Sequence, residues 1–143
     1  MEVQIRKIDS ASCIILNTKN EVLLQKKDLG YFWFPGKWCL FGGGMKNGET
    51  PEQTLIRELK NEIECEFDCF EFFCEQDYKD EYDEEVRQGK HYFYSTEFSG
   101  KPSKISINEG GGFAFFSKSE LDSVPIVEHD KKVIKQYFES KRL

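Results

Sequence analysis

Two glutamates, Glu58 and Glu62, are the residues whose type and spacing most directly suggest chemistry. They stand four positions apart, so on a helix their carboxylates lie one above the other. At about 100° per residue, the pair lies roughly 90° from the centre of an apolar stripe, at the border of the buried face. The predicted buried stripe contains Leu55, Ile56, Leu59 and Ile63, and its centre is taken at Leu55, Leu59 and Ile63. Paired carboxylates beside a glycine-rich loop suit Mg²⁺, although such pairs are also common as solvated charges.

A strand, a glycine loop and a helix must position these acids. Residues 38–41 are predicted to form a short strand that stops at the glycines of residues 42–44, where the backbone can approach a ligand closely. Thr50 is a good helix N-cap, and the proline that follows it suits the first helical position. Gln53 completes a capping-box pattern, so we predict a helix from this cap to about residue 63.

This segment resembles the catalytic box of the Nudix (MutT-like) family. The family's box is a glycine, five residues, a glutamate, seven residues, and then Arg-Glu-aliphatic-x-Glu-Glu-x-Gly-aliphatic. The residues that match it are Gly43, Glu49, Arg57, Glu58, Leu59, Glu62 and, as a soft match at the last aliphatic position, Cys65. The chain departs from the box at Asn61, where the family has a glutamate, and at Glu64, where it has a glycine.

The resemblance implies a metal site and its support. Glu58 and Glu62 would be the catalytic carboxylates and principal ligands of Mg²⁺ or Mn²⁺, joined by the backbone carbonyl of Gly43 or Gly44. An amide at Asn61 brings no negative charge, so we expect weaker metal binding than in a box with three acids.

Residues around the metal site are also implied by the resemblance. Arg57 is expected to pair with Glu49 and hold the loop against the helix. Glu109 is the first candidate for an additional catalytic base or ligand, with Glu84 and Glu85 as rivals.

The function implied is divalent-metal-dependent hydrolysis of a phosphoanhydride bond in a nucleoside diphosphate linked to another moiety. Nucleotide sugars and nucleoside triphosphates are both open as substrates, because nothing in the box separates them. The departure at Asn61 also motivates an alternative, a catalytically weakened domain that binds nucleotides or regulates a partner. RNA-end hydrolysis is a weaker option, because a net charge of −6 gives no basic groove.

A ring-rich loop, residues 28–36, precedes the box. Trp33 and Trp38 are candidates to stack on a nucleobase, since every base has a π-face. The same rings could instead close the core beneath the loop, and Trp38 is the stronger candidate for a core position. A homodimer formed through an exposed loop of this kind is a further alternative.

The remaining pattern predicts a layered α/β domain. Residues 11–16 and 21–25 read as a hairpin, 67–75 and 91–98 as strands joined across an acidic loop at 77–85, and 112–117 as a strand. A helical turn near residue 119 and a closing amphipathic helix over 128–140 follow. This order favours a Nudix-type α/β/α sandwich with a central mixed sheet, with residues 1–143 as a single domain.

Composition limits the setting. The five cysteines, at positions 13, 39, 65, 69 and 74, fit free thiols better than a disulfide framework, and with only His91 and His129 they offer no zinc spacing. Neither a signal peptide nor a membrane span is apparent. We therefore expect a cytoplasmic protein with a small nucleotide substrate, no membrane partner and no extended nucleic-acid surface.

Overall fold

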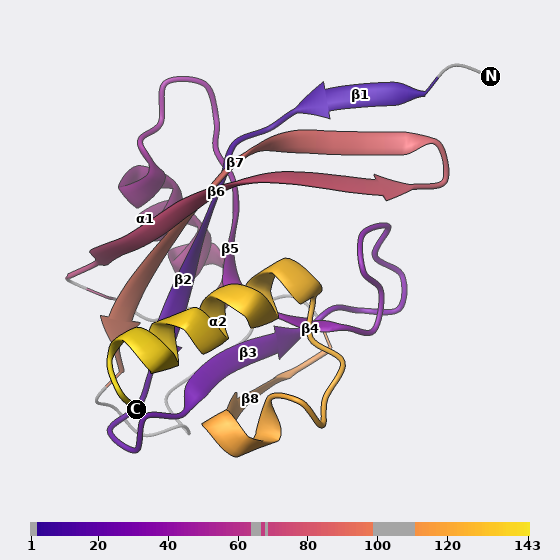
Figure 1. Cartoon of the computed structure of the whole chain (residues 1–143). Coiled ribbons are helices and arrows are strands. Elements are labelled where there is room, and N and C mark those ends of the chain that lie inside the picture. The colour runs from indigo at the N-terminus through magenta and orange to yellow at the C-terminus, as the bar shows by residue number, and fades with distance from the viewer. Residues whose placement is uncertain (1–2, 64–66, 68, 99–110) are drawn as a thin grey trace.

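The strands of the protein form one mixed sheet. The computed structural model describes residues 3–63, 67, 69–98 and 111–143. The strands are β1 (Gln4–Lys7), β2 (Ser10–Leu16), β3 (Val22–Lys26), β4 (Trp38–Cys39), β5 (Phe41–Gly44), β6 (Glu71–Tyr82), β7 (Glu85–Glu97) and β8 (Phe113–Phe116). They run in the order β1-β7-β2-β3-β4, with β5 on β2, β6 on β7 and β8 on β3 (Figure 1). Strand β7 pairs in parallel with β1 and β2, and the other pairs are antiparallel.

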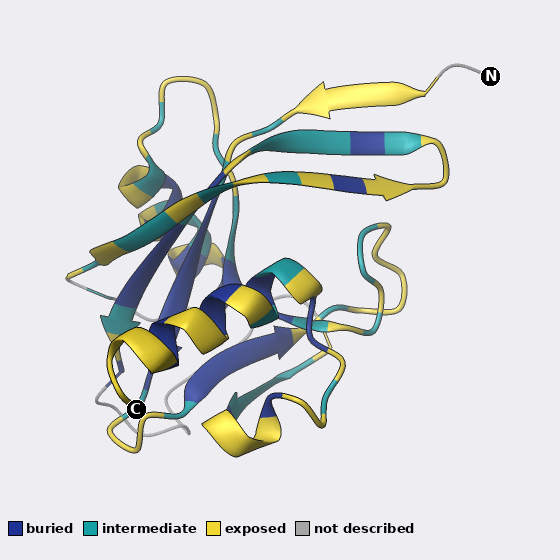
Figure 2. Ribbon diagram, viewed as in Figure 1, coloured by how far each residue is buried: buried dark blue, intermediate teal, exposed yellow. Residues whose placement is uncertain are grey.

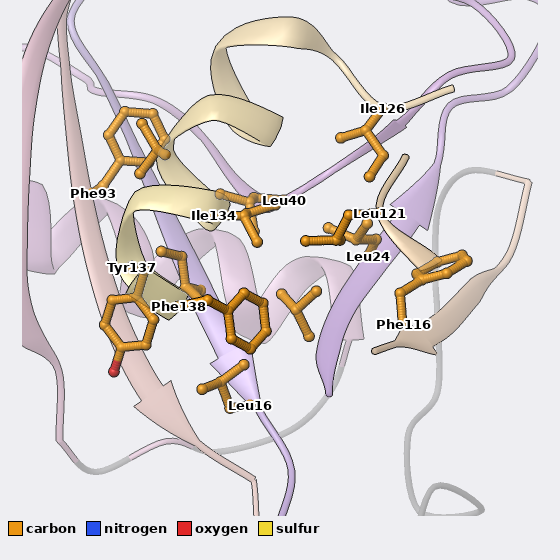
Figure 3. Close-up of a cluster of buried hydrophobic side chains, with 13 residues drawn as sticks. Leu16, Leu24, Leu40, Phe93, Phe116, Leu121, Ile126, Ile134, Tyr137 and Phe138 are labelled. Atoms are coloured by element: carbon orange, nitrogen blue, oxygen red, sulfur yellow. The ribbon is translucent and has the colours of Figure 1, made fainter. Parts of the chain in front are cut away.

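Two helices, α1 (Pro51–Ile63) and α2 (Glu128–Ser140), cover opposite faces of this sheet (Figure 1). The alternation of side chains along β2 shows the two faces. Cys13 and Ile15 belong to the apolar cluster under α1, whereas Ile14 and Leu16 belong to the cluster under α2. Figure 3 shows the α2 side of this core, and Figure 2 shows the exposed outer stripe of α2. The predicted α/β/α sandwich is therefore confirmed.

Both predicted helices are confirmed, but the prediction that Ile56 is buried was wrong, because it lies on the exposed side of α1, away from Leu55 and Leu59. At the start of α1, Thr50 Oγ1 accepts a hydrogen bond from the Gln53 amide at 3.2 Å, and Gln53 Oε1 accepts one from the Thr50 amide at 2.9 Å. This is the reciprocal capping box that the sequence predicted. Helix α2 has the predicted bounds, and a 3₁₀ turn at Lys118–Glu120 precedes it. In the part of the chain that the structure describes, no helix is long and apolar enough to cross a membrane.

The single strand predicted over residues 38–41 is instead two strands, and the glycines belong to the second. Strand β4 pairs with β3, but from Phe41 onward β5 pairs with β2. The change of partner falls at Leu40, whose amide donates to Asp130 Oδ2 at 3.0 Å. The amide of the Gln25 side chain donates to the Leu40 carbonyl at 3.4 Å. Side chains thus supply hydrogen bonds to the Leu40 backbone, at the point where the chain stops pairing with β3 and starts pairing with β2.

The hairpin predicted over residues 11–25 is confirmed near its turn, where Leu16 pairs with Val22. The rest of that edge of β2, from Ser10 to Cys13, pairs with β5. Strand β8 also lies where a strand was predicted.

The prediction of a solvated acidic loop at residues 77–85 was wrong. These residues form the outer half of β6 and a two-residue turn into β7, with Asp83 and Glu84 at φ values of 47° and 64°. The negative charge of β6 is partly neutralised across the hairpin, because Asp80 lies opposite Arg87 and accepts its Nε–H at 2.9 Å. Cross-strand charge pairs of this kind stabilise the pairing of β6 with β7, although the acidic composition alone predicts a loop here.

Candidate active site

Glu62 lies at the end of α1 with only 6% of its surface exposed. Its Oε1 accepts the Gly42 amide at 3.2 Å, and its Oε2 accepts the Gln25 side-chain amide at 2.8 Å. Burial disfavours the charged carboxylate and raises the pKa of Glu62 to about 7, and the charge of Glu58 adds to the rise. A buried acid beside a second acid is an arrangement that a bound cation would stabilise.

Glu58 lies one turn earlier on α1, against the backbone of Gly43. A Cβ atom at position 43 would lie 2.7 Å from the Glu58 carboxyl carbon and 2.9 Å from its Oε1. No side chain other than hydrogen fits there without displacing the carboxylate. The glycine therefore brings a backbone segment and an acid into the close approach that a cation site needs.

Arg57 ties the loop to the helix. Its Nε and Nη2 donate to the two oxygens of Glu49 at 2.8 and 2.9 Å, in the bidentate geometry that makes such pairs strong. Nη2 also donates to the Gly44 carbonyl at 3.0 Å, and Nη1 donates to Glu58 Oε1 at 2.5 Å. The hydrogen bond from Arg57 is the first cause that lowers the pKa of Glu49 to about 2. The structure thus brings Arg57 and Glu49 together as predicted, and the Gly44 carbonyl accepts a hydrogen bond from Arg57.

Replacing Gly43 with alanine should displace Glu58 and lower any metal-dependent activity by about tenfold or more, since misplacement by about 1 Å can cost 100-fold. The stability change should be small, because the contacted atoms are the flexible end of a side chain. Turnover and a thermal melt of Gly43→Ala would measure both. Gly30→Ala is the matched control, because a Cβ there meets nothing within 4 Å. Equal activities of the two variants would show that the close approach of Gly43 to Glu58 is not needed for activity.

The other predicted site residues are spread out. Asn61 is exposed on α1, and Glu64, Cys65 and Glu109 lie outside the described residues. Glu84 and Glu85 lie at the turn between β6 and β7, which Figure 1 shows projecting away from α1.

The two tryptophans occupy different environments. Trp38 is half-buried, packs against the apolar cluster under α2 and has its ring centroid 4.9 Å from that of Phe116. This agrees with the sequence, which favours a core position for Trp38. Trp33 is half-buried in the ring-rich loop, with the Arg87 guanidinium over its ring at 4.5 Å.

A second group of polar residues, which the sequence did not single out, surrounds a cavity of about 120 Å³ beside the glycine strand. The cavity lies on the α2 face and is lined by Ser12, Arg87, His91, His129 and Asp130 among others. A signal existed: Asp130 falls three and four positions before Val133 and Ile134, on the apolar stripe of the closing helix. A polar residue on a buried stripe needs a partner, and the sequence could not say which.

Hydrogen bonds join most of this group. His129 Nδ1 lies 2.9 Å from Asp130 Oδ1, and His91 Nε2 lies 2.7 Å from Ser12 Oγ. One potential ligand atom from each of His91, His129 and Asp130 lies within 4.8 Å of the others, a cluster that sequence spacing did not reveal. These hydrogen bonds explain the cluster without a metal, and burial lowers the pKa of His91 to about 4, so that it is neutral at pH 7.

The close approach of Gly43 to Glu58 and the buried carboxylate of Glu62 lie in a segment that a family model also recognises. The model described as NUDIX domain matches residues 6–137. The chain belongs to the Nudix family. Glu49, Arg57, Glu58 and Glu62, the residues whose spacing resembles the Nudix box, all lie within the matched residues, as does Asn61, where the chain departs from that pattern.

Individual relatives of this Nudix chain match shorter segments. It is 43% identical over 51 residues to the nucleoside triphosphatase NudI of Enterobacter sp. (strain 638), covering 36% of this chain and 36% of that protein. It is 35% identical over 54 residues to a prenyl-diphosphate phosphatase of Methanosarcina mazei, covering 38% of this chain and 32% of that protein. The matched segment spans only about a third of the length of these curated relatives.

Solved structures share the Nudix fold over nearly the whole chain. The MutT protein from Methanosarcina mazei Go1 has a TM-score of 0.82 at 14% identity, covering 99% of this chain and all of that one (100%). The NUDIX domain of Shewanella oneidensis NrtR, complexed with ADP ribose, has a TM-score of 0.76 at 17% identity, covering 98% and 90%. At these identities the likeness concerns the fold.

Proposed function

We propose that this Nudix protein hydrolyses a phosphoanhydride bond in a nucleoside diphosphate linked to another moiety, with Mg²⁺ or Mn²⁺ as its cofactor. The observation that carries the proposal is the buried acid Glu62, whose pKa is raised to about 7, beside Glu58 and its glycine cradle. Two carboxylates and a nearby backbone segment are the oxygen ligands that Mg²⁺ takes when it also binds substrate phosphate. The residues present therefore fit the metal that the family implies.

In this proposal Glu58 and Glu62 hold the cation, with the Gly43 carbonyl beside them, and Arg57 keeps Glu58 in place through its 2.5 Å contact. A divalent ion at this position supplies charge neutralisation for the phosphoryl oxygens and acidifies a bound water. Glu109 is proposed as the additional base or ligand.

We further propose that the substrate's other moiety binds on the α2 face, beside the glycine strand. The lining there is polar and charged, which suits a polar or charged group of the substrate and disfavours a prenyl chain. Of the two tryptophans, Trp33 is the better placed to contact substrate, because the Arg87 guanidinium lies over its ring and Arg87 also lines that cavity. A role for Trp38 in substrate binding would require that it act from its half-buried position against Phe116.

The first experiment is to measure phosphate and pyrophosphate release from a panel of phosphoanhydrides. The panel contains nucleoside triphosphates, nucleotide sugars, dinucleotides and a prenyl diphosphate, each with Mg²⁺, Mn²⁺ or EDTA. We expect metal-dependent turnover of one nucleotide class and none of the prenyl diphosphate. Turnover that persists in EDTA, or that is confined to the prenyl diphosphate, would contradict the proposal.

The alternative is a weakened Nudix domain that binds a nucleotide or regulates a partner without cutting. The observation that favours it is Asn61, which places a neutral amide on α1 where the family's box has a carboxylate. Nucleotide binding without turnover in either metal would support this alternative over the hydrolase.

The setting proposed is the cytoplasm, with a small nucleotide as partner and no extended nucleic-acid surface. Cys13, Cys39, Cys69 and Cys74 are free thiols, which fits a reducing compartment. A homodimer stays a prediction, and the exposed rings of Tyr31 and Phe32 in the ring-rich loop are where a contact would be sought.

A further inference from the structure

The cavity on the α2 face has a size and lining that restrict what it can bind. Its volume is about 120 Å³, somewhat less than the roughly 150 Å³ of an engineered protein cavity that holds one benzene molecule. That is room for a phosphate or a carboxylate group but not for a whole nucleoside. Its wall includes Gly42, Gly43 and Gly44, so a bound group would lie next to the proposed metal site.

Arg87 presents hydrogen-bond donors to this cavity. Its Nε donates to Asp80 Oδ2 at 2.9 Å, and its Cζ atom lies 4.5 Å from the ring centroid of Trp33 and 5.9 Å from that of Phe34. Among the residues that the structure describes, no hydrogen bond is recorded for its two terminal nitrogens. A guanidinium fixed through Nε with its terminal N–H groups unused matches the bidentate geometry of phosphate and carboxylate binding.

His129 presents a second donor to the same cavity. Its Nδ1 is hydrogen-bonded to Asp130, whereas its Nε2 is buried and has no hydrogen-bond partner within the described residues. Nε2 lies 3.7 Å from Asp80 Oδ1, close enough for an ion pair but too far for a hydrogen bond. Burial alone would lower the pKa of His129, but the hydrogen bond with Asp130 and the negative charges of Asp130 and Asp80 outweigh burial and raise the pKa to about 9. The ring is therefore a cation at neutral pH.

The charges around the cavity favour an anion. The cations are Lys27, Arg87 and His129, and the carboxylates are Asp80 and Asp130. Both carboxylates are committed, because Asp130 accepts from the Leu40 amide and from His129, and Asp80 accepts from Arg87. His91 is neutral at pH 7, and the Tyr78 hydroxyl, whose pKa is raised by burial, donates to the Ile8 carbonyl.

We propose that this cavity binds a terminal anionic group of the substrate, a phosphate or a carboxylate, through the free donors of Arg87 and His129. The inference rests on the proposed function and extends it from a reaction to a substrate class. Nucleoside triphosphates and nucleotide-linked acids are then preferred over neutral nucleotide sugars.

The test compares three ligands that share a uridine diphosphate and differ in the attached group. They are UTP (phosphate), UDP-glucuronate (carboxylate) and UDP-glucose (neutral), titrated calorimetrically in EDTA so that metal-dependent turnover cannot interfere. We expect UTP or UDP-glucuronate to bind at least about tenfold more tightly than UDP-glucose, as hydrogen bonds to charged groups allow. A preference for UTP identifies a phosphate, and a preference for UDP-glucuronate identifies a carboxylate.

Arg87→Gln should abolish that preference, because it should weaken binding of the anionic ligand far more than binding of UDP-glucose. Arg6→Gln is the matched control, because Arg6 lies on the adjacent strand β1, exposed and paired with Glu85 at 4.0 Å. Equal affinities of the wild-type protein for the three ligands, or no measurable binding of any, would overturn the inference. An equal loss for all three in Arg87→Gln would also overturn it, by showing that Arg87 contacts the shared nucleotide or only supports the fold.

A second measurement does not depend on a variant. Inorganic phosphate titrated into the ¹⁵N-labelled protein should shift the imidazole resonances of His129 more than those of His91, whose Nε2 is engaged by Ser12. Shifts confined to surface lysines would contradict the inference. A protein that prefers UTP over UDP-glucose yet hydrolyses neither would retain this inference while the proposed hydrolase function fails.

Discussion

Replacing Glu62 with glutamine is expected to reduce metal-dependent turnover by more than about 100-fold. Loss of a residue that merely supports a metal ligand typically costs 10–100-fold, and a direct ligand should exceed that range. Glutamine keeps the shape and one acceptor oxygen, so the hydrogen bond from the Gly42 amide can persist. Initial rates on the substrate class identified above, across a titration of Mg²⁺, would measure the effect.

The same variant should separate chemistry from folding. The pKa of Glu62 is raised from 4.5 to about 7, so the stability it contributes is present below pH 4.5 and is lost as the pH rises through 7. Without metal at pH 8, Glu62→Gln should therefore unfold at the same temperature as the wild type or a higher one, and Mg²⁺ should raise the melting temperature of the wild type only. Glu52→Gln, at an exposed position of α1, is the matched control. An inactive variant that is also strongly destabilised would remove the metal-ligand interpretation.

Replacing His129 with leucine is expected to lower the free energy of unfolding at pH 7 by about 3 kcal/mol. Removing one partner of a buried ion pair leaves an uncompensated charge, which typically costs 3–5 kcal/mol. The charge here is Asp130, whose side chain is 5% exposed and would keep only the Leu40 amide as a recorded partner in the described structure. Urea denaturation at fixed pH would measure the change.

The stabilisation by His129 should decrease as the pH rises. The folded pKa of His129, about 9, exceeds the ordinary 6.5, so its contribution is complete below pH 6.5 and is lost as the pH rises through 9. The stability gap between wild type and His129→Leu should narrow from pH 7 to pH 10. Glu128→Gln, at the exposed neighbouring position, should show no gap, and His129→Leu combined with Asp130→Asn should recover part of the loss. A gap that is constant with pH would mean that the histidine acts through packing and not through charge.

Local patterns in the sequence determined the elements of the box. Thr50 and Gln53 satisfy each other's backbone at the start of α1, and the periodicity of the closing helix gave its bounds correctly. The spacing of Glu58 and Glu62 placed both acids beside the buried face, and the box residues placed the chain in its family. These features depend on residues within one or two helical turns, so they can be read without knowing what packs against them.

Pairing between distant segments was decided only by the tertiary structure. The acidic residues of β6 form a strand because Arg87 lies across the ladder from Asp80, and composition alone does not contain that register. The cavity on the α2 face assembles from β2, β7 and α2, which brings together Ser12, His91 and His129 from remote positions in the chain. Its charges and pKa shifts follow from burial and from neighbours across the sheet, which sequence distance does not reveal. The sequence thus determined the family and the acids of the proposed metal site, whereas tertiary packing decided which charged groups face the rest of the substrate.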